Sequence, residues 1–175
     1  MTSVIEQQLQ IPTGTWTADP VHSSVGFEVK YLGVATFTGE LTSFQATLAD
    51  GELTGTAEVS SIEVKDENLK AHLQAPEFFD AERHPVVRFS GTAAAPGRFE
   101  GEITIKGVTK PATLEGEITG PVTDPYGNER YGLSLRTVVD RTAFGLNWNA
   151  PLPGGGFALA DDVTLKAELS LVKAA

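Results

Sequence analysis

The feature that most constrains this chain is a period-two alternation of apolar and polar residues, which recurs along most of its length. In the first such segment, Val25, Phe27, Val29 and Tyr31 alternate with glycine and charged residues. Successive side chains of a strand point to opposite faces, so this segment has one apolar and one polar face. The pattern returns in 87–90, 99–106, 112–118, 133–137 and 163–171. It predicts an all-β chain of antiparallel strands that each bury one face.

Turn residues separate these segments. Asp50-Gly51, Pro96-Gly97 and Lys106-Gly107 are suited to tight turns, and the longer connections 124–128 and 153–156 also contain proline and glycine. These are hairpin connections rather than domain linkers. We therefore expect one β-domain over residues 15–175, preceded by an N-terminal tail over residues 1–14.

One stretch, near residues 66–82, breaks the alternation and predicts a short helical insertion. Asp66 is suited to cap the N-terminus of a helix, and Leu69 and Leu73 then fall on one side of it. Pro76 would end this helix or open a second one. The insertion is the only interruption of the β pattern after Thr15.

Two architectures bury one face of about eight antiparallel strands: a two-sheet sandwich and a closed barrel. The insertion carries Leu69, Leu73, Phe78 and Phe79, which would plug the mouth of a barrel. The same helix could cover the edge of a sandwich. The insertion thus favours the barrel without excluding the sandwich.

Charge and composition exclude several classes of protein. The chain has 13 basic and 23 acidic residues, a formal net charge of −10, which argues against nucleic-acid binding through a basic surface and against adhesion to anionic lipid. No apolar run is long enough for stable membrane insertion. The first fourteen residues lack the basic and apolar regions of a secretory signal, so we expect a cytoplasmic protein.

Catalytic and metal-binding patterns are also missing from the sequence. Cysteine is absent, and the three histidines at positions 22, 72 and 84 do not have the spacing of metal ligands. There is no exposed-serine elbow of the GxSxG type, and Gly154-Gly155-Gly156 lacks the lysine and hydroxyl residue of a phosphate-binding loop. We expect no enzyme, no metal and no cofactor.

Several ordered motifs resemble those of one family over nearly the full chain. They are Trp16, Asp19-Pro20, His22-Ser23, His72-Leu73, Phe78-Phe79-Asp80, Pro85 with Phe89, Gly107-Val108-Thr109-Lys110-Pro111, Arg141, Phe144-Gly145 and Asp161-Asp162-Val163. The family is that of the YceI-like, polyisoprenoid-binding proteins. The resemblance implies a lipocalin-like, eight-stranded antiparallel β-barrel with an inserted helix, which holds a long isoprenoid chain and catalyses nothing. The chain has Leu69-Lys70 where the family usually has an Arg-Asp pair.

A lipocalin-like barrel of eight strands has room inside for one small ligand. The small residues Gly101, Ala112, Gly116 and Ala167 occupy inward positions and would leave space for it. The expected apolar wall is Phe27, Val29, Tyr31, Phe37, Leu73, Phe78, Phe79, Phe89, Phe99, Ile103, Leu114, Leu135 and Phe144.

A polar head group on the ligand would need hydrogen-bond donors. The expected donors are Arg141, His22 and His72, although each has an alternative structural role: an Arg141–Asp140 pair, a backbone contact of His22 and a helix cap by His72. The negative net charge favours a neutral quinone or prenol head over a diphosphate, which would need several cations nearby.

The expected function is therefore binding, and with it transport or storage, of a long-chain isoprenoid lipid of the quinone or polyprenyl type. For about forty carbons, ~0.3 kcal/mol per atom gives about 12 kcal/mol, which is nanomolar affinity without any polar contact. The alternative is a non-enzymatic structural or interaction protein with a solid barrel core. The long apolar segment 163–172 also allows a homodimer.

Overall fold

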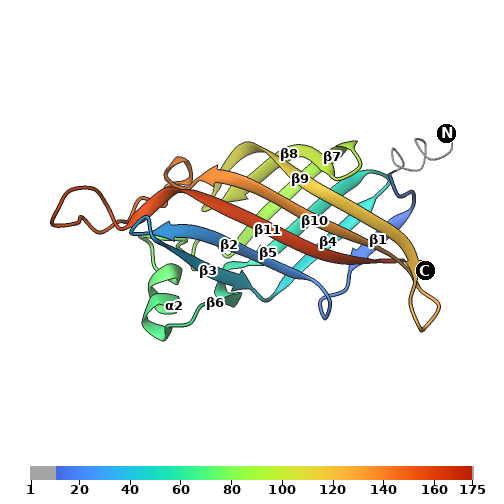
Figure 1. The fold of residues 1–175 in the computed structure, drawn as a ribbon, viewed down its shortest axis with the longest axis horizontal. Helices are drawn as coiled ribbons and strands as arrows, with labels where there is room; N and C mark the ends of the chain where they lie inside the picture. Colours follow the sequence, from blue (N-terminus) through green and yellow to red (C-terminus); the bar gives the residue numbers. More distant parts are fainter. Residues whose placement is uncertain (1–10, 175) are drawn as a thin grey trace.

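The computed structural model describes residues 11–174 and shows a closed antiparallel β-barrel with one short α-helix (Figure 1). Residues 1–10 of the expected tail lie outside the described residues. The strands are β1 (Thr15–Ala18), β2 (Ser24–Tyr31), β3 (Ala35–Leu41), β4 (Phe44–Ala49), β5 (Glu52–Glu58), β6 (Ile62–Glu63), β7 (Val86–Ala95), β8 (Arg98–Ile105), β9 (Val108–Thr123), β10 (Glu129–Asp140) and β11 (Leu159–Lys173).

Strand pairing closes the barrel through β11. One edge of β11 pairs with β10, and the other pairs with β2 at the start of β11 and with β1 at its end. The segments β1 and β2, β3 and β4, and β5 and β6 each form one interrupted strand, so the eleven segments make eight barrel strands. The barrel prediction is confirmed and the sandwich is excluded. Both edges of β11 are paired within the chain, which leaves neither edge open to a second copy.

The hairpin turns form where the sequence predicts them. Asp50 and Gly51, and likewise Lys106 and Gly107, have positive φ angles between 48° and 87°. Consecutive residues of positive φ form the turns that match the twist of paired strands. Each barrel strand is therefore followed by a neighbour in sequence, which gives an up-and-down barrel.

The predicted insertion contains α2 (Glu67–Gln74), with 3-10 helices η1 (Val59–Ser61) and η2 (Arg141–Phe144) elsewhere. Asp66 caps α2, because its Oδ1 accepts a hydrogen bond of 3.0 Å from the backbone N–H of Leu69. Leu73 is buried and Leu69 half-buried on the side that faces the barrel. Pro76 opens no second helix; the chain forms turns there instead.

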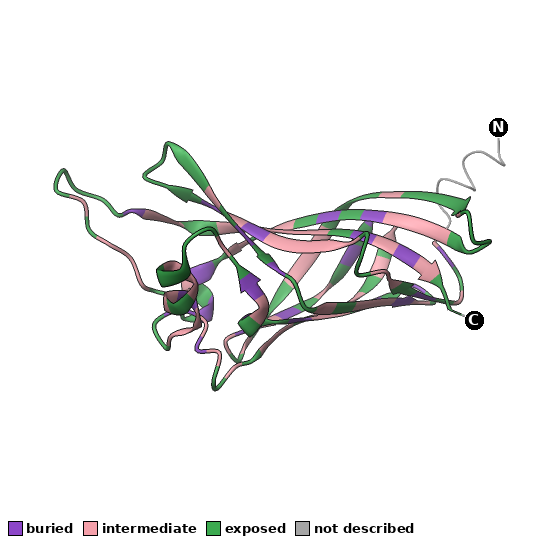
Figure 2. Cartoon of the chain, turned by 90° about the horizontal axis from the view of Figure 1, so that it is seen from below, coloured by how far each residue is buried: buried purple, intermediate pink, exposed green. Residues whose placement is uncertain are grey.

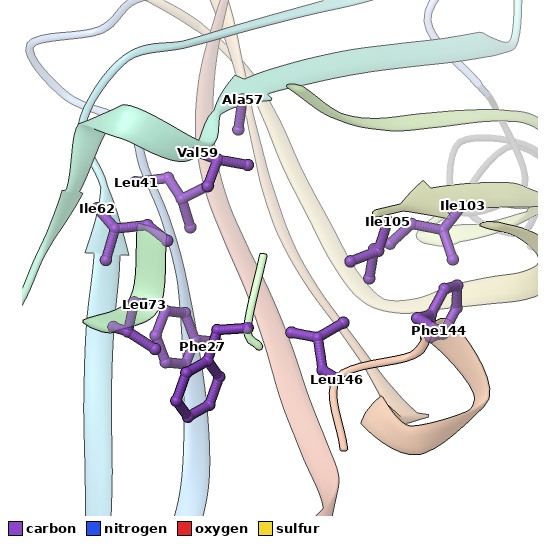
Figure 3. Close-up of a cluster of buried hydrophobic side chains, with 11 residues drawn as sticks. Phe27, Leu41, Ala57, Val59, Ile62, Leu73, Ile103, Ile105, Phe144 and Leu146 are labelled. Atoms are coloured by element: carbon purple, nitrogen blue, oxygen red, sulfur yellow. The ribbon is translucent and has the colours of Figure 1, made fainter. Parts of the chain in front are cut away.

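Two apolar clusters fill the ends of the barrel. At the end that carries α2, the buried residues of the cluster come from α2, the turns after it, η1, η2, the loop after η2 and five strands. Figure 3 shows Ile103, Ile105 and Phe144 of this cluster beside one another. The cluster at the other end contains Trp16, Leu48, Phe99, Leu133 and Leu171. Phe44 packs against both. The space between them is the site described next.

Candidate functional site

An internal cavity of about 650 Å³ lies inside the barrel. This is the size of a pocket that holds a small organic ligand, for which the usual range is roughly 300–1,000 Å³. Its lining draws on both apolar clusters, with Leu73 and Phe78 at the α2 end and Leu53 and Leu169 towards the other. The barrel is therefore not filled by its own side chains.

The strands, α2, the turns after it and η2 together bring almost all of the wall predicted from the sequence to the cavity. The exception is Phe99, which is fully buried in the second cluster with Trp16 and Leu133 and does not line the cavity. Its inward direction follows the alternation, but its position along the barrel axis is too deep. The predicted residues in the lining are Phe27, Val29, Tyr31, Phe37, Leu73, Phe78, Phe79, Phe89, Ile103, Leu114, Leu135 and Phe144.

The small inward residues do not create this cavity in the way the sequence suggests. Of the four, Ala167 lines it, whereas Gly101, Ala112 and Gly116 do not. A Cβ atom at Gly101 would lie 1.9 Å from the carbonyl oxygen of Ser90, and one at Gly116 would lie 1.7 Å from that of Ser134. These glycines therefore let neighbouring strands approach closely where the sheet curves into a barrel. The expectation that they leave room for a ligand is wrong.

The α2 end of the cavity is closed by aromatic contacts between two distant parts of the chain. His72 of α2 packs edge-on against Phe78 and Trp148, with ring centroids 4.7 and 4.8 Å apart. Phe78 and Trp148 lie 5.3 Å apart and both line the cavity. His72 itself does not line it, and its Nε2 lies 3.6 Å from Oε1 of Glu77. The structure thus places His72 in the cap behind the wall.

Arg141 lines the cavity and is only 6% exposed. Its Nε donates to the carbonyl oxygen of Ala160 at 2.8 Å, and its Nη1 donates to those of Leu146 and Trp148 at 2.6 and 2.8 Å. Burial lowers the pKa of the Arg141 guanidinium, although Asp161, with Oδ1 3.8 Å from Nη2, opposes this. An arginine stays charged in any case. Most of its donors hold the backbone of the segment 146–160.

The carboxylate expected to pair with Arg141 has another role. Asp140 accepts hydrogen bonds from the backbone N–H and the hydroxyl of Thr142, at 2.9 and 2.6 Å, and so caps η2. These bonds lower the pKa of Asp140 below its ordinary value. Asp140 therefore fixes the start of η2, while Arg141 fixes the loop that follows.

His22 lies at the opposite end of the barrel from Arg141. It is exposed in the β1–β2 connection, and its Nδ1 lies 2.7 Å from Oδ2 of Asp19. Arg130 donates to Asp19 as well, at 3.0 Å, and to Asp124 at 2.7 Å. The structure therefore does not bring the three predicted head-group residues together, and Arg141 is the one at the cavity.

Sequence reasoning missed part of the cap. Leu146 and Trp148 line the cavity from the irregular segment between η2 and β11, where no alternation marks the inward side. The missed signal is compositional: residues 142–160 contain no charged side chain, although 36 of 175 residues are charged. A long uncharged segment outside any strand is best explained by packing against apolar surface.

Among residues 11–174, no group of three or more histidine, aspartate or glutamate side chains is placed to hold a metal ion. Separately, α2 is too short and too polar to span a bilayer, and no other helix in the described chain is long and apolar enough either.

A closed eight-stranded antiparallel barrel with a capped apolar interior defines the lipocalin-like class of folds. Within that class, the sequence identifies one family. The family model of the YceI-like domain matches residues 16–171, and the chain belongs to this family.

Known proteins agree with this assignment. A UPF0312 protein of Staphylococcus aureus is 29% identical over 161 residues, which cover 87% of this chain and 94% of that protein. The structure of a Campylobacter jejuni YceI protein has a TM-score of 0.68 at 24% identity, over 83% of this chain and 90% of that one. A polyisoprenoid binding domain from Saccharophagus degradans, implicated in plant cell wall breakdown, has a TM-score of 0.67 at 10% identity, over 91% and 98%.

Proposed function

We propose that this protein binds the tail of a long-chain isoprenoid lipid, of the quinone or polyprenyl type, inside the barrel. The observation that carries the proposal is the cavity of about 650 Å³, whose lining is made almost entirely of aliphatic and aromatic side chains. Such a lining offers an apolar chain a water-free site, and burial of each methylene is worth about 0.8 kcal/mol before the costs of binding. The isoprenoid class is supported by the name of the Saccharophagus degradans relative.

The head group of the ligand would lie at the Arg141 end of the cavity. The lining contains three cationic side chains: Arg141, which is buried, Lys166, which is paired with Glu28 at 2.6 Å, and Arg88, which is exposed. Three of the N–H groups of Arg141 are already bonded to backbone carbonyls, and Asp161 lies near the rest. A diphosphate would need several free cations, so this arrangement favours a neutral quinone or prenol head. The role is binding, with transport or storage of the lipid, and not catalysis.

The direct test is to purify the protein without detergent, extract it with organic solvent and identify the recovered lipid by mass spectrometry. The expected product is a neutral prenyl lipid in stoichiometric amount. Recovery of phosphorylated prenols alone would contradict the neutral head. If no isoprenoid is recovered and the lipid-stripped protein does not bind an added prenol, the proposed function is wrong.

A cavity-filling variant separates internal binding from adsorption to the outer surface. Ala167 of β11 lines the cavity, so Ala167→Leu should reduce its volume and weaken prenol binding by about tenfold. Ala94 of β7 is exposed and lies outside the lining, so Ala94→Leu is the matched control and should bind as the unaltered protein does. Equal affinities for the two variants would place the ligand elsewhere.

A further inference from the structure

Two segments without a single charged residue meet at the α2 end of the barrel. They are residues 31–39, which contain the β2–β3 turn, and residues 142–160, which contain the loop before β11. The backbone N–H of Leu32 donates to the carbonyl oxygen of Ala158 at 2.8 Å, and Tyr31 pairs with Leu159 across the strands. Figure 1 shows the loop before β11 extending beyond the barrel beside this turn. Figure 2 colours the chain by burial, with exposed residues in green.

Several large apolar side chains of these segments are exposed. Val34 is 86% exposed and Phe157 is 63% exposed, and Tyr31 and Leu32 are exposed as well. We call these four residues the apolar rim. Exposed apolar groups that cluster on one surface, rather than lying singly, mark sites of interaction.

Part of the cavity lining is exposed at the apolar rim, beside the aromatic contacts that close the rest of the α2 end. Tyr31 and Ala35 are exposed and at the same time belong to the cavity lining, together with Ala158 and Leu159 from the facing segment. The rim is therefore continuous with the interior. A ligand tail that enters here passes directly from whatever covers the rim into the barrel.

The backbone conformation of the β2–β3 turn does not favour a leucine at position 32, so the needs of folding do not explain why Leu32 is there. Leu32 and Gly33 have φ angles of +58° and +71°, and the N–H of Val34 donates to the carbonyl oxygen of Tyr31 at 3.2 Å. A turn with two central residues of positive φ strongly prefers Asn-Gly, and a leucine in this region is strained. The chain thus keeps an apolar residue where conformation and exposure both disfavour it.

We propose that the apolar rim docks onto the surface of an electrically neutral lipid bilayer, so that an isoprenoid tail enters the cavity without crossing water. The entry of an isoprenoid tail rests on the proposed function, whereas the docking of the rim onto a bilayer does not. A neutral bilayer fits because neither segment contains a cation, the adjacent Lys30 donates to Thr36 at 3.0 Å, and the net charge of −10 is repelled by anionic lipid. A stable protein partner would need about 20–30 residues a side, far more than the rim offers.

Vesicle flotation tests the docking directly. The unaltered protein is expected to float with phosphatidylcholine vesicles, and the double variant Val34→Glu, Phe157→Glu should partition at least about tenfold less. The matched control is Val122→Glu, Tyr126→Glu. Val122 and Tyr126 are 62% and 88% exposed near the β9–β10 hairpin at the opposite end, so the control adds the same charge away from the rim. It should float as well as the unaltered protein.

Leu32→Asn distinguishes docking from a folding defect. Asparagine suits the turn better than leucine, so this variant should unfold at a higher urea concentration and yet float several-fold less. A destabilised protein cannot give that combination. If Leu32→Asn floats like the unaltered protein, the rim is not the docking surface.

Three further results would overturn the docking proposal: no flotation of the unaltered protein, equal loss in the rim and control double variants, or tighter binding to vesicles that contain phosphatidylglycerol. Prenol binding measured without vesicles keeps the two proposals apart. We expect the rim variants to bind the prenol like the unaltered protein. Flotation without any prenol binding would leave the docking standing and refute the isoprenoid site.

Discussion

At the scale of single residues, Arg141 shows how a side chain can line a site and yet serve mainly to hold its frame. It bonds the carbonyl oxygens of Leu146, Trp148 and Ala160, which lie on both sides of the loop before β11. The loop carries Trp148 of the cap and Phe157 of the apolar rim. One buried cation therefore positions two parts of the cavity entrance.

Arg141→Met should lower the free energy of unfolding by about 3 kcal/mol, because it leaves one buried and two partly buried carbonyls unpaired, each at a cost of about 1–3 kcal/mol. Urea unfolding measures this loss, and amide exchange should become faster in residues 146–160. Arg136→Met, which replaces an exposed arginine of β10, the strand that leads into η2, is the control and should change stability little. A loss below about 0.5 kcal/mol for Arg141→Met would contradict the anchoring role.

The ion pairs of Arg130 with Asp19 and Asp124 should make the stability of the fold depend on pH in the acid range. Hydrogen bonds from His22, the Val21 N–H and Arg130 lower the pKa of Asp19 from 3.8 to about 2. The pKa of Asp124 is lowered from 3.8 to about 2 as well, and the hydrogen bond from Arg130 is the main cause. Carboxyl groups whose pKa is lower in the folded state stabilise it above the unfolded pKa of 3.8 and lose this effect as the pH falls towards 2.

The urea midpoint of the unaltered protein should therefore fall between about pH 4 and pH 2, and Arg130→Gln should reduce the slope in that window. Lys173→Gln removes an equal charge from an exposed pair with Glu129, 3.4 Å away, and should leave the slope unchanged. Parallel curves for the unaltered protein and Arg130→Gln would show that Arg130 does not set these pKa values.

At the scale of elements, the cap of the cavity depends on the short helix α2, whose N-terminus is capped by the side chain of Asp66. Asp66→Ala should destabilise α2 by about 1 kcal/mol, because the N–H of Leu69 loses its acceptor. Asp66→Asn retains an acceptor of equal quality and should behave like the unaltered protein. Amide exchange of residues 67–74, together with the release rate of a bound prenol, measures the effect. Equal amide exchange in both variants would show that packing alone, and not the Asp66 cap, fixes where α2 begins.

The elements are also the scale at which the sequence is most informative. Alternation and turn residues predict the strands and the insertion, because burial of one face leaves a period of two in the chain. Alternation gives the direction of a side chain but not its depth along the barrel axis, which is why Phe99 lies below the cavity. It also cannot distinguish a glycine that leaves room from one such as Gly101, where the neighbouring strand already fills the space.

At the scale of the whole molecule, the site combines residues that no local pattern connects. His72 and Trp148 meet through the insertion and the loop before β11. The size of the cavity is likewise a property of the closed barrel, and its 650 Å³ limits the ligand. A methylene group in a liquid occupies about as much space as a water molecule, ~30 Å³, so the cavity holds roughly 20 carbons, or about four isoprene units. Of a forty-carbon chain, about half the length and the head group would lie outside the cavity, so Arg141 would meet the head group only of a chain of about four units.

The most direct test of the account is to titrate the lipid-stripped protein with prenols that differ by one isoprene unit. At ~0.3 kcal/mol per atom, each added unit should raise the affinity about tenfold until about four units fill the cavity, after which the affinity should level off. Calorimetry should show a negative heat-capacity change that grows over the same range. Affinities that do not depend on tail length would contradict the claim that the barrel interior receives the chain.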